Sequence, residues 1–345
     1  MATAAGGGAR EVRLAEVPKG LPEARHFTVA EWPVPRPGPG EVLVRNRHFV
    51  VFAALRTLMG GAVQDTPMPP LRAGDTLFGP AVAEVVTAPD GSALRPGTPV
   101  LHMLGWREYA VLPADQCVRL DQDGALPEPV QYLNQGATAY GALTRLGEVR
   151  AGDTVLVTGA AGAVGTLAGQ IARQLGAGRV IGTTGSAEKA ERLVAELGYD
   201  AAVLRGAGPG SFARRLAEAA PDGVDVLLDN VGGEQLTAAV DVARKGARFA
   251  LVGALSGQLD ADGDGGAAPA VIDSYRLILR GVSVRGYAGM EHLDVAPEWT
   301  VRFGAWLRSG GIDFPHTRIA GIERAPQALE DLVRGSHFGT VVVDV

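Results

Sequence analysis

The chain has 345 residues, of which 46% are hydrophobic and 20% charged, and its formal net charge is −6. This length favours two domains, and no stretch approaches the roughly 18 consecutive apolar residues of a membrane span. An acidic balance without any basic run argues against nucleic acid as a partner.

Cysteine usage and the N-terminus bear on the location of the protein. The single cysteine, Cys117, excludes an internal disulfide and fits a reducing compartment. The first residues, MATAAGGGAR, show no apolar core behind a basic start, so we expect no signal peptide there. The cytoplasm is the expected location.

The first part of the chain, residues 1–124, predicts a mostly β domain. Turn signals stand at residues 36–41 and 89–92, between short runs rich in valine and leucine. These runs are EVRLAEVP, HFTVAEWPVP, GEVLVRNRHFVVF, TLFGPAVAEVVTA and WREYAVLP.

Residues 125–294 predict an α/β domain with a doubly wound parallel sheet. Apolar runs alternate with segments of helical period, and strands that are apolar throughout are typical of a parallel sheet covered on both faces. The expected strands are TVLVTG, RVIGTT, AAVL, VDVLLDN, ARFALVG and VSVRGY. The expected helices lie at 163–175, 186–197, 211–220, 234–244 and 271–280.

Residues 295–345 break this alternation. PEWTVRFGAWLRSG and APQALEDLVRG predict helices, and TVVVDV predicts a closing strand. We expect this last part to return to the first domain.

Residues 154–176, TVLVTGAAGAVGTLAGQIARQLG, predict a dinucleotide-binding turn. Gly159, Gly162 and Gly165 follow a buried strand and lead into a helix, whose first N–H groups can approach a diphosphate. Gly165 would allow close contact between helix and strand. Ala160 stands where GxGxxG has its first glycine, and the alternative is a small-residue turn that only tightens packing.

The end of the second strand indicates which nucleotide binds. An NAD site commonly places Asp or Glu about 20 residues past the glycines, on the ribose 2′-hydroxyl. This chain has Thr183, Thr184, Gly185 and Ser186 there. Lys189 and Arg192 follow, so a 2′-phosphate is favoured and NADPH is the expected cofactor. The alternative is a solvated helix face, with both cations paired to Glu188 and Glu196.

The sequence predicts chemistry without a metal. Cys117 and six scattered histidines lack the spacing of a zinc site, and Cys117 is expected to be a buried, inert thiol. Addition of hydride to a conjugated carbonyl compound develops charge on one oxygen, which a single hydroxyl donor can stabilise.

Several motifs together carry a family resemblance. They are VPKGLP, GEVLVRN, GWREYAV, NQGATAYGAL, VTGAAGAVG, DGVDVLLDNVGG, LVGALS and HFGTVVV. With these the chain resembles the zinc-independent medium-chain dehydrogenase/reductases, and among them the NADPH-dependent alkenal/one oxidoreductases. The resemblance implies a GroES-like catalytic domain formed by both ends of the chain, a Rossmann domain between them, and a homodimer paired through the edges of Rossmann sheets.

The resemblance also implies cofactor contacts. The family's pyrophosphate loop is matched by Ala160, Ala161, Gly162, Ala163 and Val164. Segments near the ribose and nicotinamide are matched by Asn230, Gly253, Ala254, Leu255, Ser256 and Tyr287. Lys189 matches the lysine of the 2′-phosphate pocket, which Arg205, at a tyrosine position, would strengthen, and His337 replaces an asparagine near the nicotinamide. Asn230 could instead cap a strand end, and Tyr287 could be a core or interfacial residue.

The substrate side departs from the family pattern. In VVFAALR, Arg56 is kept, whereas Phe52 and Ala54 stand where the family has Asp and Tyr. The remaining candidates for a proton donor are His292, Tyr287 and Tyr275, although a loop histidine such as His292 is commonly just an exposed side chain.

The leading functional hypothesis is NADPH-dependent reduction of a conjugated C=C bond in a small-molecule substrate. Two alternatives remain open. One is quinone or carbonyl reduction, and the other is a cofactor-binding protein without redox activity, which the missing pocket tyrosine suggests.

Overall fold

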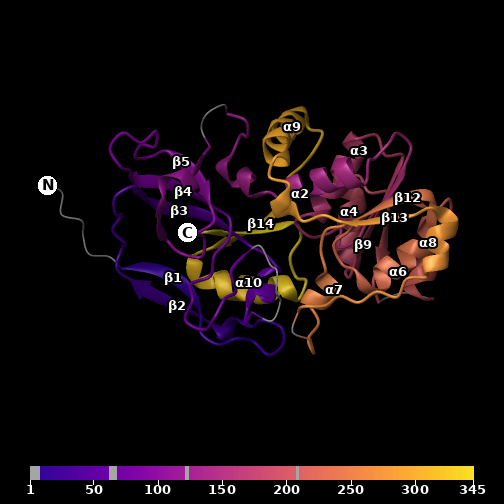
Figure 1. Ribbon diagram of the computed structural model, residues 1–345, viewed down its shortest axis with the longest axis horizontal. Helices are drawn as coiled ribbons and strands as arrows, with labels where there is room; N and C mark the ends of the chain where they lie inside the picture. The colour runs from indigo at the N-terminus through magenta and orange to yellow at the C-terminus, as the bar shows by residue number, and fades with distance from the viewer. Residues whose placement is uncertain (1–7, 62–67, 121–123, 207–209, 264) are drawn as a thin grey trace. The chain divides into compact units, whose positions relative to one another are not determined.

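The computed structural model describes residues 8–61, 68–120, 124–206, 210–263 and 265–345. Residues 1–7, on which part of the expectation for the N-terminus rests, lie outside this set. The chain forms two compact units (Figure 1). Unit 1 comprises Met1–Leu133, Thr317–Ser336 and Val341–Val345, and unit 2 comprises Asn134–His316 and His337–Thr340.

Unit 2 contains a six-stranded sheet in the order β10-β9-β8-β11-β12-β13, with every pairing parallel. Its strands are β8 (Thr154–Val157), β9 (Arg179–Thr184), β10 (Ala201–Leu204), β11 (Val224–Asp229), β12 (Ala243–Leu251) and β13 (Ser283–Gly286). This confirms the predicted doubly wound sheet. The strand order reverses between β8 and β11, where such sheets bind ligands at their carboxyl ends.

The helices of unit 2 form two groups around this sheet (Figure 1). Helices α3 (Gly165–Gln174) and α4 (Ala187–Leu197) contact each other and β9. Helices α5 (Phe212–Ala219), α6 (Gly233–Asp241) and α8 (Ser274–Arg280) form the second group, through contacts of α6 with both others. The apolar core between the second group and the sheet includes Phe212, Leu216, Leu227, Leu236 and Phe249.

Further segments of unit 2 flank this sheet. They are α2 (Gly136–Gly141), a π-helical turn (Ala142–Leu146), α7 (Leu255–Gln258), a 3-10 turn (Gly289–Glu291) and α9 (Val295–Ser309). We predicted that residues 295–345 return to the first domain as a whole, but α9 packs on α2. Trp299 of α9 lies 5.7 Å from the ring of Tyr140 and donates from its indole N–H to Asn134 at 2.8 Å. Sequence periodicity predicts that a helix has an apolar face, but it does not predict which surface that face packs against.

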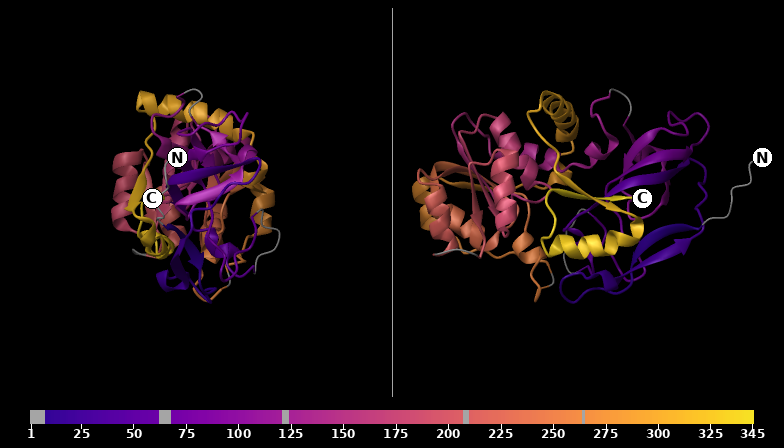
Figure 2. Two further views of the ribbon diagram at one scale, coloured as in Figure 1. Left: turned by 90° about the vertical axis from the view of Figure 1, so that its left-hand side faces the viewer. Right: turned by 180° about the vertical axis from the view of Figure 1, so that it is seen from behind.

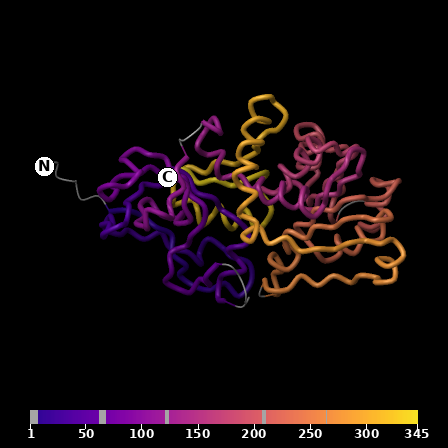
Figure 3. Tube along the Cα trace, turned by 45° about the horizontal axis from the view of Figure 1, so that its top comes forward, coloured from indigo at the N-terminus to yellow at the C-terminus, as the bar shows by residue number. Residues whose placement is uncertain are grey.

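Unit 1 contains a seven-stranded sheet in the order β14-β15-β3-β4-β5-β7, with β6 paired to β3 beside this path, and a separate β1-β2 pair. The strands are β1 (Ala9–Leu14), β2 (Phe27–Trp32), β3 (Glu41–Val51), β4 (Ala81–Thr87), β5 (Pro99–His102), β6 (Tyr109–Pro113), β7 (Val118–Arg119), β14 (His316–Ala320) and β15 (Thr340–Asp344). The tube in Figure 3 shows the yellow C-terminal residues among the indigo and purple ones, because β15 pairs with β3. The mostly β prediction is confirmed.

The helices of unit 1 are short. They are α1 (Leu55–Leu58), α10 (Ala325–Val333) and 3-10 turns at Ala24–His26, Ala114–Gln116, Pro129–Leu133 and Ile322–Arg324. Helix α10, yellow in Figure 2, lies beside the early part of the chain and contacts β3. Both ends of the chain therefore build this unit, as the resemblance implied.

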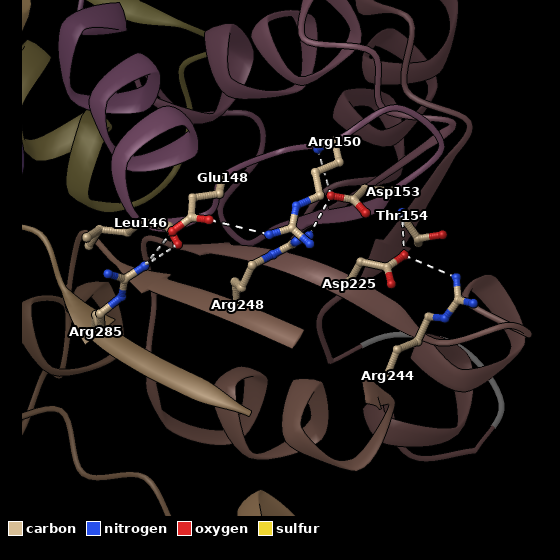
Figure 4. A network of polar contacts seen from close by, with 9 residues as sticks. All are labelled: Leu146, Glu148, Arg150, Asp153, Thr154, Asp225, Arg244, Arg248 and Arg285. Carbon is tan, nitrogen blue, oxygen red and sulfur yellow. Dashed lines mark hydrogen bonds and ion pairs between the residues drawn. The ribbon is translucent and has the colours of Figure 1, made fainter. Parts of the chain in front are cut away.

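Ion pairs connect segments near the amino-terminal ends of the unit 2 strands (Figure 4). Arg248 donates to Asp153 at 2.5 Å, and both side chains are nearly buried, at 12% and 13% exposure. Arg244 pairs with Asp225, whose carboxylate also accepts the backbone N–H of Thr154 at 2.9 Å. These charges are neutralised within the fold.

Candidate functional site

The glycine turn after β8 has the geometry expected of a diphosphate site. Gly159 adopts a left-handed backbone, with φ of +59°, and explains why glycine stands one place before the expected first glycine. The backbone N–H of Ala160 donates to Thr183 at 2.9 Å, and that of Gly162 donates to Gly159 at 3.1 Å. These bonds shape a compact turn, which leads into α3 at Gly165.

Gly165 brings α3 unusually close to this turn. A Cβ at this position would stand 2.5 Å from both the Cα of Ala160 and the carbonyl oxygen of Gly159. The buried hydroxyl of Tyr199 donates to the carbonyl of Gly165 at 2.6 Å, and burial strongly raises the pKa of Tyr199. The expected close approach of helix and strand is therefore present.

Buried hydroxyl groups hold the turn, and the sequence analysis did not identify them. Thr183 accepts the backbone N–H of Gly159 at 3.0 Å and donates to Gln235 at 2.6 Å. The hydroxyl of Thr158 donates to Asp229. Threonines that directly end apolar strands are the available signal, but their partners are distant in sequence.

The predicted 2′-phosphate residues meet beyond β9 and β10. Ser186 caps α4 by accepting the backbone N–H of Lys189 at 3.4 Å. Arg205 follows β10, and its guanidinium lies 3.6 Å from where a Cβ of Gly185 would stand. The four residues come from neighbouring strand ends because β9 pairs with β10. In the described part of the chain, residues 183–186 and 205–206, which end these two strands, contain no carboxylate.

The two cations of α4 have different surroundings. Arg192 forms an i,i+4 pair with Glu196, at 2.9 Å, as the solvated-face alternative expected. Lys189, in contrast, is half-buried and donates to the carbonyl of His337, and burial lowers the pKa of Lys189. His337, which we expected near the nicotinamide, thus contacts Lys189, the lysine predicted to meet a 2′-phosphate.

The side chain of Asn230 caps a strand end, which was the alternative to a direct cofactor contact. Its side-chain N–H donates to the carbonyl of Thr158 at 2.7 Å, which joins the ends of β11 and β8. The expected segment Gly253, Ala254, Leu255 and Ser256 lies directly beside it. Leu255 donates its backbone N–H to the carbonyl oxygen of Asn230 at 3.1 Å, and a Cβ on Gly253 would stand 2.8 Å from that oxygen.

Two of the three candidate proton donors lie together. The rings of Tyr287 and His292 stack at 4.5 Å with 10° between their planes. Tyr287 is buried, which raises its pKa, and its hydroxyl lies against Gly141, where a Cβ would be only 1.8 Å away. Tyr275 takes no part in this stack, and its side chain on α8 is 64% exposed.

The substituted residues of the substrate side lie in unit 1. Ala54 precedes α1, Arg56 is buried within it, and the ring of Phe52 lies against Gly79. A Cβ on Gly79 would stand 2.7 Å from that ring. Phe52 therefore fills space with an apolar ring where the family has a carboxylate.

The described residues contain no group of three or more His, Cys, Asp or Glu side chains that could hold a metal ion. His102 is buried and bonded to Asn46 at 2.9 Å, and burial lowers its pKa to about 4. Burial also raises the pKa of Cys117 to about 11, which fits a thiol of low reactivity. Within the same residues, no helix is both long and apolar enough to cross a bilayer.

A doubly wound sheet with a glycine turn at its switch point and cations beyond β9 defines a dinucleotide-binding protein. Residues 163–303 match the family described as zinc-binding dehydrogenase, and residues 10–120 match the N-terminal domain of oxidoreductase. The chain is 33% identical to a putative NADP-dependent oxidoreductase of Bacillus subtilis, with 97% of each chain covered. It is 30% identical to the NADPH-dependent curcumin reductase of Escherichia coli, over 96% of this chain and 95% of that one.

A solved structure gives the same result. The crystal structure of CurA in complex with NADPH from Vibrio vulnificus superposes with a TM-score of 0.87 at 28% identity, covering 97% of this chain and 99% of that one. The chain belongs to the medium-chain dehydrogenase/reductase family, and it is an oxidoreductase.

Proposed function

We propose that this oxidoreductase reduces the conjugated C=C bond of a small α,β-unsaturated carbonyl compound without a metal ion. Its cofactor is NADPH, which supplies a hydride when bound. The observation that carries the choice of cofactor is that Lys189 and Arg205 follow the adjacent strands β9 and β10, while residues 183–186 hold no carboxylate where an NAD site commonly has one. The curcumin reductase and the NADPH-bound CurA structure support this cofactor.

The residues present fit such a dinucleotide. The turn of small residues 159–164 leads directly into the first N–H groups of α3, where an anion is favoured. We propose that Ala160, Ala161, Gly162, Ala163 and Val164 border the diphosphate. Asn230 would act there by fixing the strand ends, and the segment 253–256 would border the ribose and nicotinamide.

We propose that His292 stabilises the negative charge that develops on the carbonyl oxygen. Tyr287 has its hydroxyl against Gly141, and its stacked ring would orient the imidazole. Tyr275 is the weakest candidate because it lies on α8 and takes no part in the stacked pair. His292→Phe keeps the stacking but removes both nitrogen atoms, so it should lower kcat by about a hundredfold and leave NADPH affinity unchanged. An unchanged kcat would eliminate His292.

A substrate panel tests the reaction. Purified protein would be given NADPH with an enal, an enone, a quinone and a saturated ketone, and both NADPH consumption and product mass would be followed. We expect turnover of the enal or enone to a product with a saturated C=C bond. Turnover of the quinone or ketone alone would instead support quinone or carbonyl reduction. NADPH binding without turnover of any compound would support a cofactor-binding protein without redox activity.

We also propose a homodimer formed through the edge of the unit 2 sheet. Strand β13 ends this sheet, and α8 beside it exposes Tyr275, Ile278 and Leu279, each by more than 60%. Apolar residues gathered in this way are typical of an interface. Ile278→Asp should halve the mass measured by light scattering, whereas Val301→Asp, an equally exposed valine on α9, should not. A monomeric wild-type protein would contradict the proposal.

The cytoplasm is the proposed location, because the chain has one cysteine and no disulfide to maintain. Cell fractionation with an antibody against the protein would test this. Recovery with a secreted or membrane fraction would contradict it.

A further inference from the structure

Residues 337–340, here called the closing segment, belong to unit 2 although residues of unit 1 precede and follow them. Gly339 donates its backbone N–H to Ala161 at 2.9 Å and is the parallel bridge partner of Gly162. Its φ is +78°, and a Cβ there would stand 2.1 Å from the carbonyl oxygen of Pro315. The closing segment is therefore held in one position against the glycine turn.

The closing segment supplies an aromatic surface for one cation of α4. Phe338 is only 6% exposed, and the guanidinium carbon of Arg192 lies 3.9 Å from the centre of its ring. An arginine at this distance is attracted by the ring face. Its Nε and Nη2 donate to Glu196 at 2.9 and 3.0 Å, so the N–H groups of Nη1 are those offered to an anion. The side chain of Arg192 is 40% exposed, and Phe338 covers one face of its guanidinium.

The same segment contacts the second cation of α4. The ammonium of Lys189 donates to the carbonyl of His337, the residue before Phe338. Lys189 and Arg192 are three positions apart on α4, so their side chains lie on one face of the helix. Consecutive residues of the closing segment therefore hold neighbouring cations.

We propose that the closing segment sets the preference for a phosphorylated ribose. Phe338 fixes the guanidinium of Arg192, and the His337 carbonyl fixes the ammonium of Lys189, so that a 2′-phosphate meets both cations already in place. Arg192 and Phe338 would thus determine specificity together with Lys189. This inference rests on the proposed function, because it requires NADPH as the cofactor.

The pair between Arg192 and Glu196 is the competing explanation for the position of Arg192. A comparable i,i+4 pair joins Arg214 and Glu218 on α5, where the arginine side chain is 73% exposed. Phe338 is what distinguishes Arg192 from Arg214. If the pair alone mattered, changing Phe338 would leave nucleotide binding unaffected.

Calorimetry with nicotinamide-free nucleotides tests the inference. Adenosine 2′,5′-bisphosphate carries the 2′-phosphate, and AMP differs by lacking it. Phe338→Leu should raise the dissociation constant for the bisphosphate by about fivefold and leave that for AMP unchanged. Phe338→Tyr keeps the aromatic face and should behave like the wild type.

A second variant tests the inference at a partly exposed residue, because a change at buried Phe338 could impair folding. Arg192→Lys keeps the positive charge but loses the planar group, and the side chain is partly exposed, so we expect the same selective loss. Arg214→Lys is the matched control and should change neither constant. Thermal unfolding of every variant would verify that it is folded.

Distinct outcomes would overturn the two proposals. Equal weakening of both nucleotides by Phe338→Leu, or no effect of Arg192→Lys, would overturn the inference while leaving NADPH as the cofactor. A wild-type protein that does not prefer the bisphosphate to AMP would overturn the proposed cofactor site, and the inference with it.

Discussion

The two ends of the unit 2 sheet differ in the partners of their basic side chains. Near the amino-terminal ends of its strands, basic groups such as Arg248 and Arg244 are paired with carboxylates of the fold (Figure 4). At the carboxyl ends, buried hydroxyls and small residues shape the glycine turn, and the ammonium of Lys189 donates to a backbone carbonyl. We therefore expect the first end to contribute mainly to stability and the second to bind an anionic ligand.

The largest effect should follow from filling the space between α3 and the turn. Gly165→Ala places a Cβ 2.5 Å from Ala160 and should lower NADP+ affinity by about a hundredfold, because the turn must move. Calorimetry would measure this. Gly286→Ala, at a glycine with open space around it, is the control. Normal affinity in Gly165→Ala would mean that the turn does not form the diphosphate site.

A change at the opposite end should affect stability alone. Arg248→Met leaves the nearly buried carboxylate of Asp153 without its cation and should lower the free energy of unfolding by about 3 kcal/mol. NADP+ affinity should stay unchanged. Arg244→Met, at a more exposed pair, should cost less than about 1 kcal/mol. Chemical denaturation and calorimetry would separate the two ends, and a marked loss of affinity in Arg248→Met would refute the comparison.

Lys189→Gln should have a smaller, selective effect. Removing the ammonium should weaken NADP+ binding by about tenfold, since hydrogen bonds to charged groups contribute about 1.5 kcal/mol or more. NAD+ binding should be unaffected. Lys245→Gln on β12 serves as the control. If NAD+ and NADP+ lose affinity equally, Lys189 supports the fold and does not select the nucleotide.

A histidine outside this sheet, His102 of unit 1, should make the stability depend on pH without involving either end of the sheet. Burial lowers the pKa of His102 from 6.5 to about 4, so the folded unit 1 holds it neutral while the unfolded chain protonates it below pH 6.5. Stability present above pH 6.5 is therefore lost as the pH falls toward 4. At pH 5 the loss should be about 2 kcal/mol. Chemical denaturation above pH 6.5 and at pH 5 should show this loss of stability in the wild type and not in His102→Leu.

The sequence predicted the parallel sheet well because short runs rich in apolar residues alternate regularly with segments of helical period. Ser186 and Lys189 were related to one site by their place after the second strand, and Arg205 by the family resemblance; the structure shows that the strands they follow are neighbours. The glycine at the left-handed position, Gly159, was one residue from the standard pattern, and only the backbone angle explains this.

Contacts distant in sequence could not be predicted from local patterns. Helix α9 was assigned to the wrong neighbour because an apolar stripe fits any complementary surface, and the contact of Trp299 with Tyr140 on α2 identifies its partner. The contact of the closing segment with Lys189 joins residues far apart in the chain, and it leaves no periodic signal.

The closing segment has a consequence for synthesis of the protein. Translation delivers residues 337–340 only after every strand of the six-stranded sheet has been made, so a nascent chain that has already formed this sheet still lacks part of the proposed nucleotide pocket. Binding of the cofactor can then stabilise only chains in which the closing segment has already packed against α4. NADPH would therefore stabilise the completely folded protein and would not assist the early steps of folding.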